Sequence, residues 1–249
     1  MNNKVSILGV KIDSMTFNQT FEKTKSLLET DNVDMIFTPN PEIIMHAHRD
    51  EEFKNILNTA SICTADGIGV VKAANILNTP LPERVAGFDL ASLIIEYASE
   101  TGKSIFFFGA APNVADAAKK RLTEKYPSLK IAGTRNGYFT NDDTPEIIEQ
   151  INQSRADVLF VCLGAPKQEK WICNNRDKLN VKLALGLGGA LDVFAGVTKR
   201  APKIFINLNL EWFYRLLKNP SRIGRFMALP KFIVTVKKEK KRNKNEITK

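Results

Sequence analysis

The chain has 249 residues, of which 43% are hydrophobic and 25% charged, and this composition supports one globular domain with or without an appendage. No apolar run approaches the roughly 18 residues that span a bilayer, and the N-terminal residues lack the apolar core of a signal peptide, so we expect a cytosolic protein. The three cysteines are widely spaced and form no CxxC pair, which argues against a disulfide framework, and the net charge of +9 suggests a polyanionic partner.

Short apolar runs alternate with amphipathic segments along the first 198 residues. The runs are apolar throughout, which is typical of strands covered on both faces. They lie at 33–38, 60–65, 104–110, 157–165 and 181–188, with a weaker one at 129–133. Helices are expected at 17–30, 114–126 and 145–155, with Asn113 as an N-cap and Thr144-Pro145 as a cap followed by the first helical residue. The alternation predicts an α/β, Rossmann-like fold with a largely parallel sheet.

Small, polar or glycine residues follow each of these runs directly. In parallel α/β sheets, ligands bind outside the carboxyl ends of the strands. The residues in question are 38–42, 66–67, 109–113, 164–169 and 188–189. We therefore expect one ligand-binding cleft at this edge, although tight turns use many of the same residue types.

Several common sites are absent from the sequence. The glycines of GLGGALDVFAG (186–196) do not fit G-x-G-x-x-G, and there is no P-loop. His46 and His48 are the only histidines, and their i, i+2 spacing does not point them in one direction on a helix. We expect neither a metal nor a cofactor. The chain also lacks an Asp-x-Asp pair, so any phosphate-linked leaving group needs protein cations.

Candidate phosphate-binding groups follow the strands. Arg84 lies in LPERVAGFDL before an expected helix, and Lys167 and Gln168 lie at an expected helix N-terminus, where N–H groups and the helix dipole favour anions. Three glycines allow a close approach of a ligand to the backbone, or merely a tight turn: Gly109, Gly188 and Gly189. Surface ion pairs are the alternative reading of the charged residues.

Asp66 is the most distinctive residue of this set. It ends the run SICTA and precedes Gly67-Ile68-Gly69, and Thr38 and Asn40 end a neighbouring run. An aspartate in this position is often only an N-cap. In a polar cleft it can instead act as the general base that deprotonates an attacking hydroxyl. A retaining mechanism would need a second carboxylate as its nucleophile. No other carboxylate stands out at the strand ends, apart from Glu42 and Glu169.

Eight motifs in order resemble the TagA/WecG/CpsF family of bacterial glycosyltransferases, family 26, over about Val5 to Phe232. They are TPNPEI, TADGIGVV, PERVAGFDL, FFFGAAPNVADAA, GYF, LGAPKQEKWI, GLGGALDVFAGVTKRAP and LNLEWFYRLLKNPSRIGRFMALPKF. The C-terminal motif is most similar to the TagA branch. The resemblance implies inverting, metal-independent transfer of N-acetylmannosamine from UDP to the 4-hydroxyl of N-acetylglucosamine on a lipid diphosphate, an early step of wall teichoic acid synthesis.

The resemblance also implies roles for individual residues. Asp66 corresponds to the proposed base, and Thr38, Asn40, Arg84 and Gln168 correspond to the family's other active-site positions. By the same analogy, arginines of the C-terminal segment complete the site over the donor diphosphate. These are Arg215, Arg222 and Arg225. The family further leads us to expect a homo-oligomer.

The basic charge belongs to the end of the chain. Residues 199–249 hold fifteen Lys and Arg against three acids, a net charge of +12, which leaves −3 for residues 1–198. We expect a catalytic domain at 1–198 and a basic, amphipathic appendage at 199–249 that docks on the anionic inner face of the cell membrane. A helix packed on the core with solvated charges is the simpler alternative.

Two other functions fit part of the sequence. A WecG-like enzyme would use the uronic acid form of the donor, or another UDP-hexose, and would need an additional cation in the sugar pocket. A nucleic-acid-binding protein with a basic tail would explain the charge, but the tail has no recognised nucleic-acid motif, so we expect no nucleic-acid partner.

Overall fold

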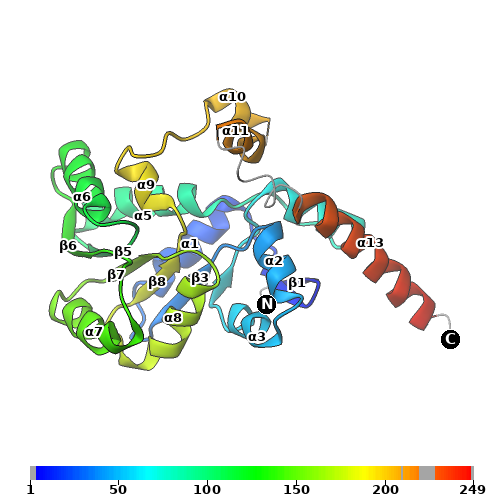
Figure 1. Ribbon diagram of the computed structural model, residues 1–249, viewed down its shortest axis with the longest axis horizontal. Coiled ribbons are helices and arrows are strands. Elements are labelled where there is room, and N and C mark those ends of the chain that lie inside the picture. The colour runs from blue at the N-terminus through cyan, green and yellow to red at the C-terminus, as the bar shows by residue number, and fades with distance from the viewer. Residues whose placement is uncertain (1–3, 209, 219–227, 248–249) are drawn as a thin grey trace.

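A six-stranded parallel sheet forms the centre of the computed structural model, which describes residues 4–208, 210–218 and 228–247 (Figure 1). Its strand order is β4-β3-β8-β7-β5-β6. The strands are β3 (Asp34–Phe37), β4 (Ile62–Cys63), β5 (Ser104–Gly109), β6 (Lys130–Arg135), β7 (Val158–Cys162) and β8 (Leu183–Gly186). The expected α/β architecture with a parallel sheet is confirmed, and the weak run at 129–133 is the edge strand β6.

Two helical layers cover the sheet, which explains why most strands are apolar on both faces. The helices on one face are α2 (Pro41–Ala47), α3 (Glu51–Asn58), α4 (Ile68–Ile76), α7 (Thr144–Gln153) and α8 (Lys167–Asn175). Helix α13 (Ala228–Ile247) packs in turn on α2 and α4. The other face packs against α1 (Phe17–Leu27), α5 (Gly87–Thr101), α6 (Val114–Lys125) and α9 (Ala190–Phe194). The helices α10 (Lys203–Asn207) and α11 (Glu211–Lys218) follow α9.

Adjacent strands near the middle of the sheet send their following loops to opposite faces. The chain leaves β3 toward α2 on one face, whereas it leaves the neighbouring β8 toward α9 on the other face. Such a divergence opens a crevice at the carboxyl ends of the strands, where ligands bind in open α/β sheets. The fold therefore places the expected cleft beside β3, β4 and β8.

An N-terminal hairpin was not predicted. Strands β1 (Lys4–Ile7) and β2 (Val10–Asp13) pair in antiparallel fashion around Leu8 and Gly9, both of which have positive φ. Two such residues in succession fit the tight turn that the twist of a hairpin favours. Ile7, Val10 and Ile12 are fully buried, and Cys63 N of β4 donates a hydrogen bond to Asp13 Oδ2 (2.8 Å), so this hairpin lies beside β4 and extends the core.

Three local predictions were wrong in detail. The strand expected at 60–65 is limited to β4, after which Ala65 O accepts a hydrogen bond from Val85 N. Asn113 is the N-cap residue of α6 as expected, but it has φ of 68° and its side chain makes no capping hydrogen bond. Helix α7 begins at Thr144 itself, with Asp143 before it and Pro145 in its first turn.

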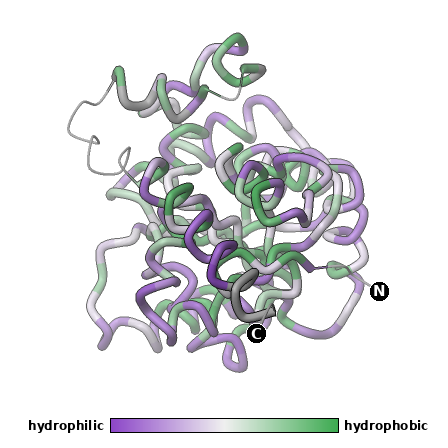
Figure 2. Tube along the Cα trace, turned by 90° about the vertical axis from the view of Figure 1, so that its right-hand side faces the viewer, coloured by the Kyte–Doolittle hydropathy of each residue, from purple (hydrophilic) through white to green (hydrophobic). Residues whose placement is uncertain are grey.

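The last described helix packs on the body of the protein. Phe232 and Val236 of α13 are fully buried against the core that includes α2 and α4. Gly69 of α4 permits this contact, because a Cβ there would lie 2.5 Å from Leu229 Cδ1 and 2.7 Å from Pro41 Cγ. Hydrophilic residues cover much of α13 elsewhere (Figure 2). The simpler alternative of a helix packed on the core therefore holds for this part of residues 199–249.

Candidate active site

The polar residues expected at the sheet edge lie around the ends of β3 and β4. Thr38 Oγ1 donates a hydrogen bond to Gly186 O (3.3 Å), which joins the loops after β3 and β8. Thr38 also packs against the start of α5, where a Cβ on Gly87 would lie 2.7 Å from its Oγ1. Glycine in PERVAGFDL thus brings α5 close to Thr38.

Asp66 does not cap the helix that follows it. Gly67 is the N-cap of α4, with φ of 91° and no capping hydrogen bond from a side chain. The Asp66 carboxylate points instead to the N-terminus of α5, where its Oδ2 accepts a long hydrogen bond from Gly87 N (3.5 Å). The side chain is partly exposed at the carboxyl edge. This position suits a base that an incoming hydroxyl can reach.

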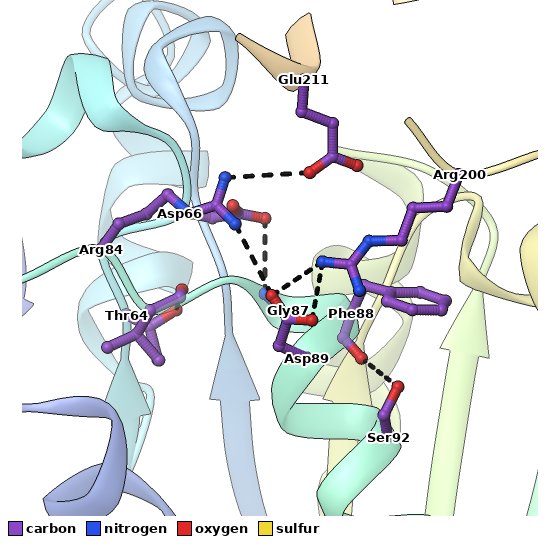
Figure 3. Close-up of polar contacts among 10 residues, drawn as sticks. Thr64, Asp66, Arg84, Gly87, Phe88, Asp89, Ser92, Arg200 and Glu211 are labelled. Carbon is purple, nitrogen blue, oxygen red and sulfur yellow. Dashed lines mark hydrogen bonds and ion pairs between the residues drawn. The ribbon is translucent and has the colours of Figure 1, made fainter. Parts of the chain in front are cut away.

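Arg84 lies beside Asp66 in a cluster of charged residues (Figure 3). Its Nη2 is 3.6 Å from Asp89 Oδ2, and its Nη1 is 3.8 Å from Glu211 Oε2. Arg200 Nη2 contacts both oxygens of Asp89, at 2.7 and 2.9 Å. The Arg200 guanidinium also lies over the Phe88 ring, which stacks on Phe194. Two arginines and three carboxylates thus converge here. Both arginines are ion-paired with carboxylates, and Arg84 offers an anionic ligand a cation beside the candidate base.

Three of these charged residues were not predicted from the sequence. Asp89 could have been found from the sequence, because it lies in the same motif as Arg84 and is an acidic residue in the first turn of a helix. Arg200 and Glu211 gave no local signal, because their importance arises from contacts with residues more than 100 positions away.

Asn40 has a structural role in this geometry. Its Oδ1 accepts a hydrogen bond from Ile43 N (3.0 Å), so the residue is the N-cap of α2. The cap orients the loop after β3 and leaves the amide group of Asn40 at the same sheet edge as Asp66.

Gln168 is buried and joins two loops. Its Oε1 accepts hydrogen bonds from Gly164 N (3.2 Å) and Gly188 N (2.9 Å), and its Nε2 donates to Glu169 Oε1 (2.8 Å). Both glycines have positive φ. Because its acceptor oxygen is engaged by two backbone N–H groups, Gln168 fixes the loops after β7 and β8 relative to each other.

Glu169 is a buried acid, only 1% exposed, and burial raises the pKa of its carboxyl above the ordinary 4.5. A raised pKa favours the protonated form in the folded state. The contribution of Glu169 to the free energy of unfolding is therefore fully present below pH 4.5 and is lost as the pH rises to the folded-state pKa.

We expect Glu169→Gln, which keeps an acceptor for Gln168, to gain stability relative to wild type between pH 4 and pH 7. Urea unfolding of both proteins at the two pH values measures this difference; an equal difference at both would contradict the burial argument.

The glycines of the candidate site differ in what surrounds them. At Gly109, with φ of 129°, a Cβ would lie 2.4 Å from Cys162 O, so the neighbouring strand requires glycine there. At Gly188, with φ of 55°, a Cβ would meet nothing within 4 Å, and Gly189 precedes α9 at an exposed position.

This contrast yields a prediction for stability. We expect Gly109→Ala to cost about 2–5 kcal/mol, because it combines an unfavourable φ with a backbone clash. The matched variant Gly188→Ala has the φ penalty alone and should cost about 1–2 kcal/mol. Thermal unfolding of the two variants checks the order; a larger loss at Gly188 would contradict it.

The basic residues expected to bind phosphate are only partly brought together. Lys167 is exposed at the first position of α8, and its Nζ lies 3.9 Å from the centre of the Phe139 ring. With Gly137, Tyr138 and Thr140 it lines an open hollow of about 490 Å³ at the same edge of the sheet. Arg215 belongs to α11, but its side chain lies outside the described part, as do Arg222 and Arg225 entirely.

No metal-binding cluster of three or more His, Cys, Asp or Glu side chains is found in residues 4–208, 210–218 and 228–247. Over the same ranges, no helix is long and apolar enough to cross a membrane.

The fold and the edge cluster define an α/β protein with a polar, cation-containing ligand site at the carboxyl ends of parallel strands. Residues 5–246 match the Glycosyl transferase WecG/TagA/CpsF family. Two relatives from Staphylococcus aureus, strains MRSA252 and MW2, are each 37% identical over 97% of this chain and 95% of their own length. Both are named N-acetylglucosaminyldiphosphoundecaprenol N-acetyl-beta-D-mannosaminyltransferase. The chain belongs to the WecG/TagA/CpsF family of glycosyltransferases.

Proposed function

We propose that this enzyme transfers N-acetylmannosamine from UDP to the 4-hydroxyl of N-acetylglucosamine on undecaprenyl diphosphate, with formation of a β-1,4 linkage. The observation that carries the proposal is the placement of Asp66 beside Arg84 at the carboxyl edge of the sheet. The names of the relatives support the same donor sugar and acceptor. The product would serve wall teichoic acid synthesis.

Asp66 is the base in this mechanism. The acceptor hydroxyl attacks the anomeric carbon, its proton passes to the Asp66 carboxylate, and the bond from that carbon to the UDP oxygen breaks. A single displacement inverts the configuration. The other two carboxylates of the cluster are poor candidates for the nucleophile of a retaining mechanism, because Asp89 has both oxygens on Arg200 and Glu211 contacts Arg84.

Arg84 stabilises the departing diphosphate. Its guanidinium is a permanent cation, and α5 presents its N-terminus at the same place, where the helix dipole adds partial positive charge. Thr38, Asn40 and Gln168 hold the loops that follow β3, β7 and β8 at the same edge of the sheet. These groups supply the charge stabilisation that a metal gives other sugar-nucleotide enzymes.

The transfer assay uses the full chain with UDP-N-acetylmannosamine and a lipid-diphosphate-N-acetylglucosamine acceptor in EDTA. Mass spectrometry of the lipid should show the addition of one N-acetylhexosamine, and UDP release should require the acceptor. UDP-N-acetylglucosamine and the uronic acid form of the donor are the controls. Preferred transfer of the uronic acid would support the WecG-like alternative, and no transfer from any donor would overturn the proposal.

We further propose that residues 199–249 bring the enzyme to the anionic inner face of the cell membrane. The basic residues Lys237, Lys238 and Lys241 are exposed on α13, and the apolar residues Ile204, Leu208 and Leu217 are exposed on and beside α10 and α11. Together they provide apolar and cationic groups for a lipid surface.

Vesicle sedimentation tests membrane binding. We expect the protein to bind vesicles of phosphatidylglycerol but not of phosphatidylcholine, and to be released by high salt. Replacing the three exposed lysines with glutamate should abolish binding. Retention on RNA but not on the vesicles would favour the nucleic-acid alternative instead.

Homo-oligomerisation stays a prediction, for which analytical ultracentrifugation is the measurement.

A further inference from the structure

Four charged residues form an alternating chain across three separate segments. Glu211 of α11 contacts Arg84, Arg84 contacts Asp89 of α5, and Asp89 contacts Arg200 (Figure 3). Both ends of this series of contacts, Glu211 and Arg200, lie in the segment that follows residue 198. Arg84, the candidate phosphate-binding residue, lies between them.

The pair formed by Arg84 and Glu211 is shielded from solvent. The side chains of Arg84 and Glu211 are only 15% and 14% exposed. Opposite charges with this little exposure interact more strongly than a surface pair, and removing one of them leaves the other poorly compensated. Asp89 cannot replace Glu211 easily, because Arg200 already contacts both of its oxygens.

The two contacts of Arg84 use different ends of its guanidinium group. Nη1 faces Glu211, and Nη2 faces Asp89. A planar group held at both ends by carboxylates has a defined orientation, which leaves its remaining N–H groups for another anion. Stacking of Arg200 on Phe88 helps to hold Asp89 in turn.

We propose that Glu211 is a positioning residue that orients Arg84 for the donor diphosphate and, through the same contact, docks α11 over the active site. The inference rests on the proposed function of Arg84 as a diphosphate-binding residue. This role also explains why an acidic residue lies next to a site that binds an anion. Glu211 contacts one end of the Arg84 guanidinium and does not compete with the diphosphate for the rest of it.

Hydrogen–deuterium exchange of residues 211–218 tests the docking without reference to activity. In the full chain, Glu211→Ala and Arg84→Ala should each raise the exchange rate of this segment about tenfold, and Glu211→Gln should raise it less. Glu124→Gln, which removes an exposed acid from α6, is the matched control and should change nothing. Unchanged exchange in Glu211→Ala would overturn the docking.

Kinetics and UDP binding test the orientation of Arg84. Glu211→Ala should lower kcat/KM about tenfold and weaken binding of UDP more than of uridine, and it should cause no further loss in the Arg84→Ala background. Tighter binding of UDP with unchanged turnover would show that Glu211 merely competes for Arg84, and would overturn the proposal. If wild type transferred no sugar, the proposed function would fail, whereas the exchange result would still decide the docking.

Discussion

We expect Asp66→Asn to lower acceptor-dependent turnover by about 10²–10⁴-fold, the usual contribution of a general base. The amide cannot take the acceptor's proton, but its oxygen can still accept the hydrogen bond from Gly87 N. The variant should therefore fold like wild type, and its melting temperature should be nearly unchanged. UDP release in EDTA measures turnover.

The control for this variant removes a carboxylate outside the proposed site. Asp177 is exposed and lies beyond the C-terminal end of α8, toward the amino edge of the sheet, so Asp177→Asn should leave turnover unchanged. Turnover of Asp66→Asn within twofold of wild type would contradict the assignment of Asp66 as the base.

Arg84→Ala should have the second largest effect. Loss of one member of a partly buried charged cluster that we propose binds the donor diphosphate is expected to cost about 2–4 kcal/mol of binding, roughly 30–1,000-fold. Arg84→Lys should restore only part of this, because an ammonium group cannot contact Asp89, Glu211 and a phosphate from the two ends of a planar fork.

Isothermal titration with UDP and with uridine separates the charge effect from a general disturbance of the site. The affinity for UDP should fall strongly in Arg84→Ala, whereas the affinity for uridine, which has no phosphate, should change little. Equal losses for both ligands would contradict the role of Arg84 in binding the diphosphate.

Much of the sheet was predictable because its strands are short apolar runs enclosed by helices. β5 and β7 are buried along almost their whole length, and such runs are evident in a sequence. The hairpin was missed because polar residues interrupt it, as Ser6 and Lys11 do. The many lysines of α13 favoured a membrane-docking appendage over a helix packed on the core, because they hide the two fully buried residues, Phe232 and Val236.

The site was predictable where it follows strand ends and not where it depends on tertiary contacts. Thr38 and Asp66 follow neighbouring strands, so the fold rule alone places them together. The partners of Arg84 could not be inferred in this way. Glu211 reaches it from α11 and Arg200 reaches Asp89 from the segment after α9, and no sequence spacing encodes either contact.

The most direct test of the account is a crystal structure of the full chain with UDP. We expect the diphosphate to lie at the carboxyl edge of the sheet, within hydrogen-bonding distance of Arg84, with Asp66 facing the space where the sugar would continue. UDP bound elsewhere, for example in the cavity of about 720 Å³ between α7 and α8, with Arg84 still contacting only Asp89 and Glu211, would contradict it.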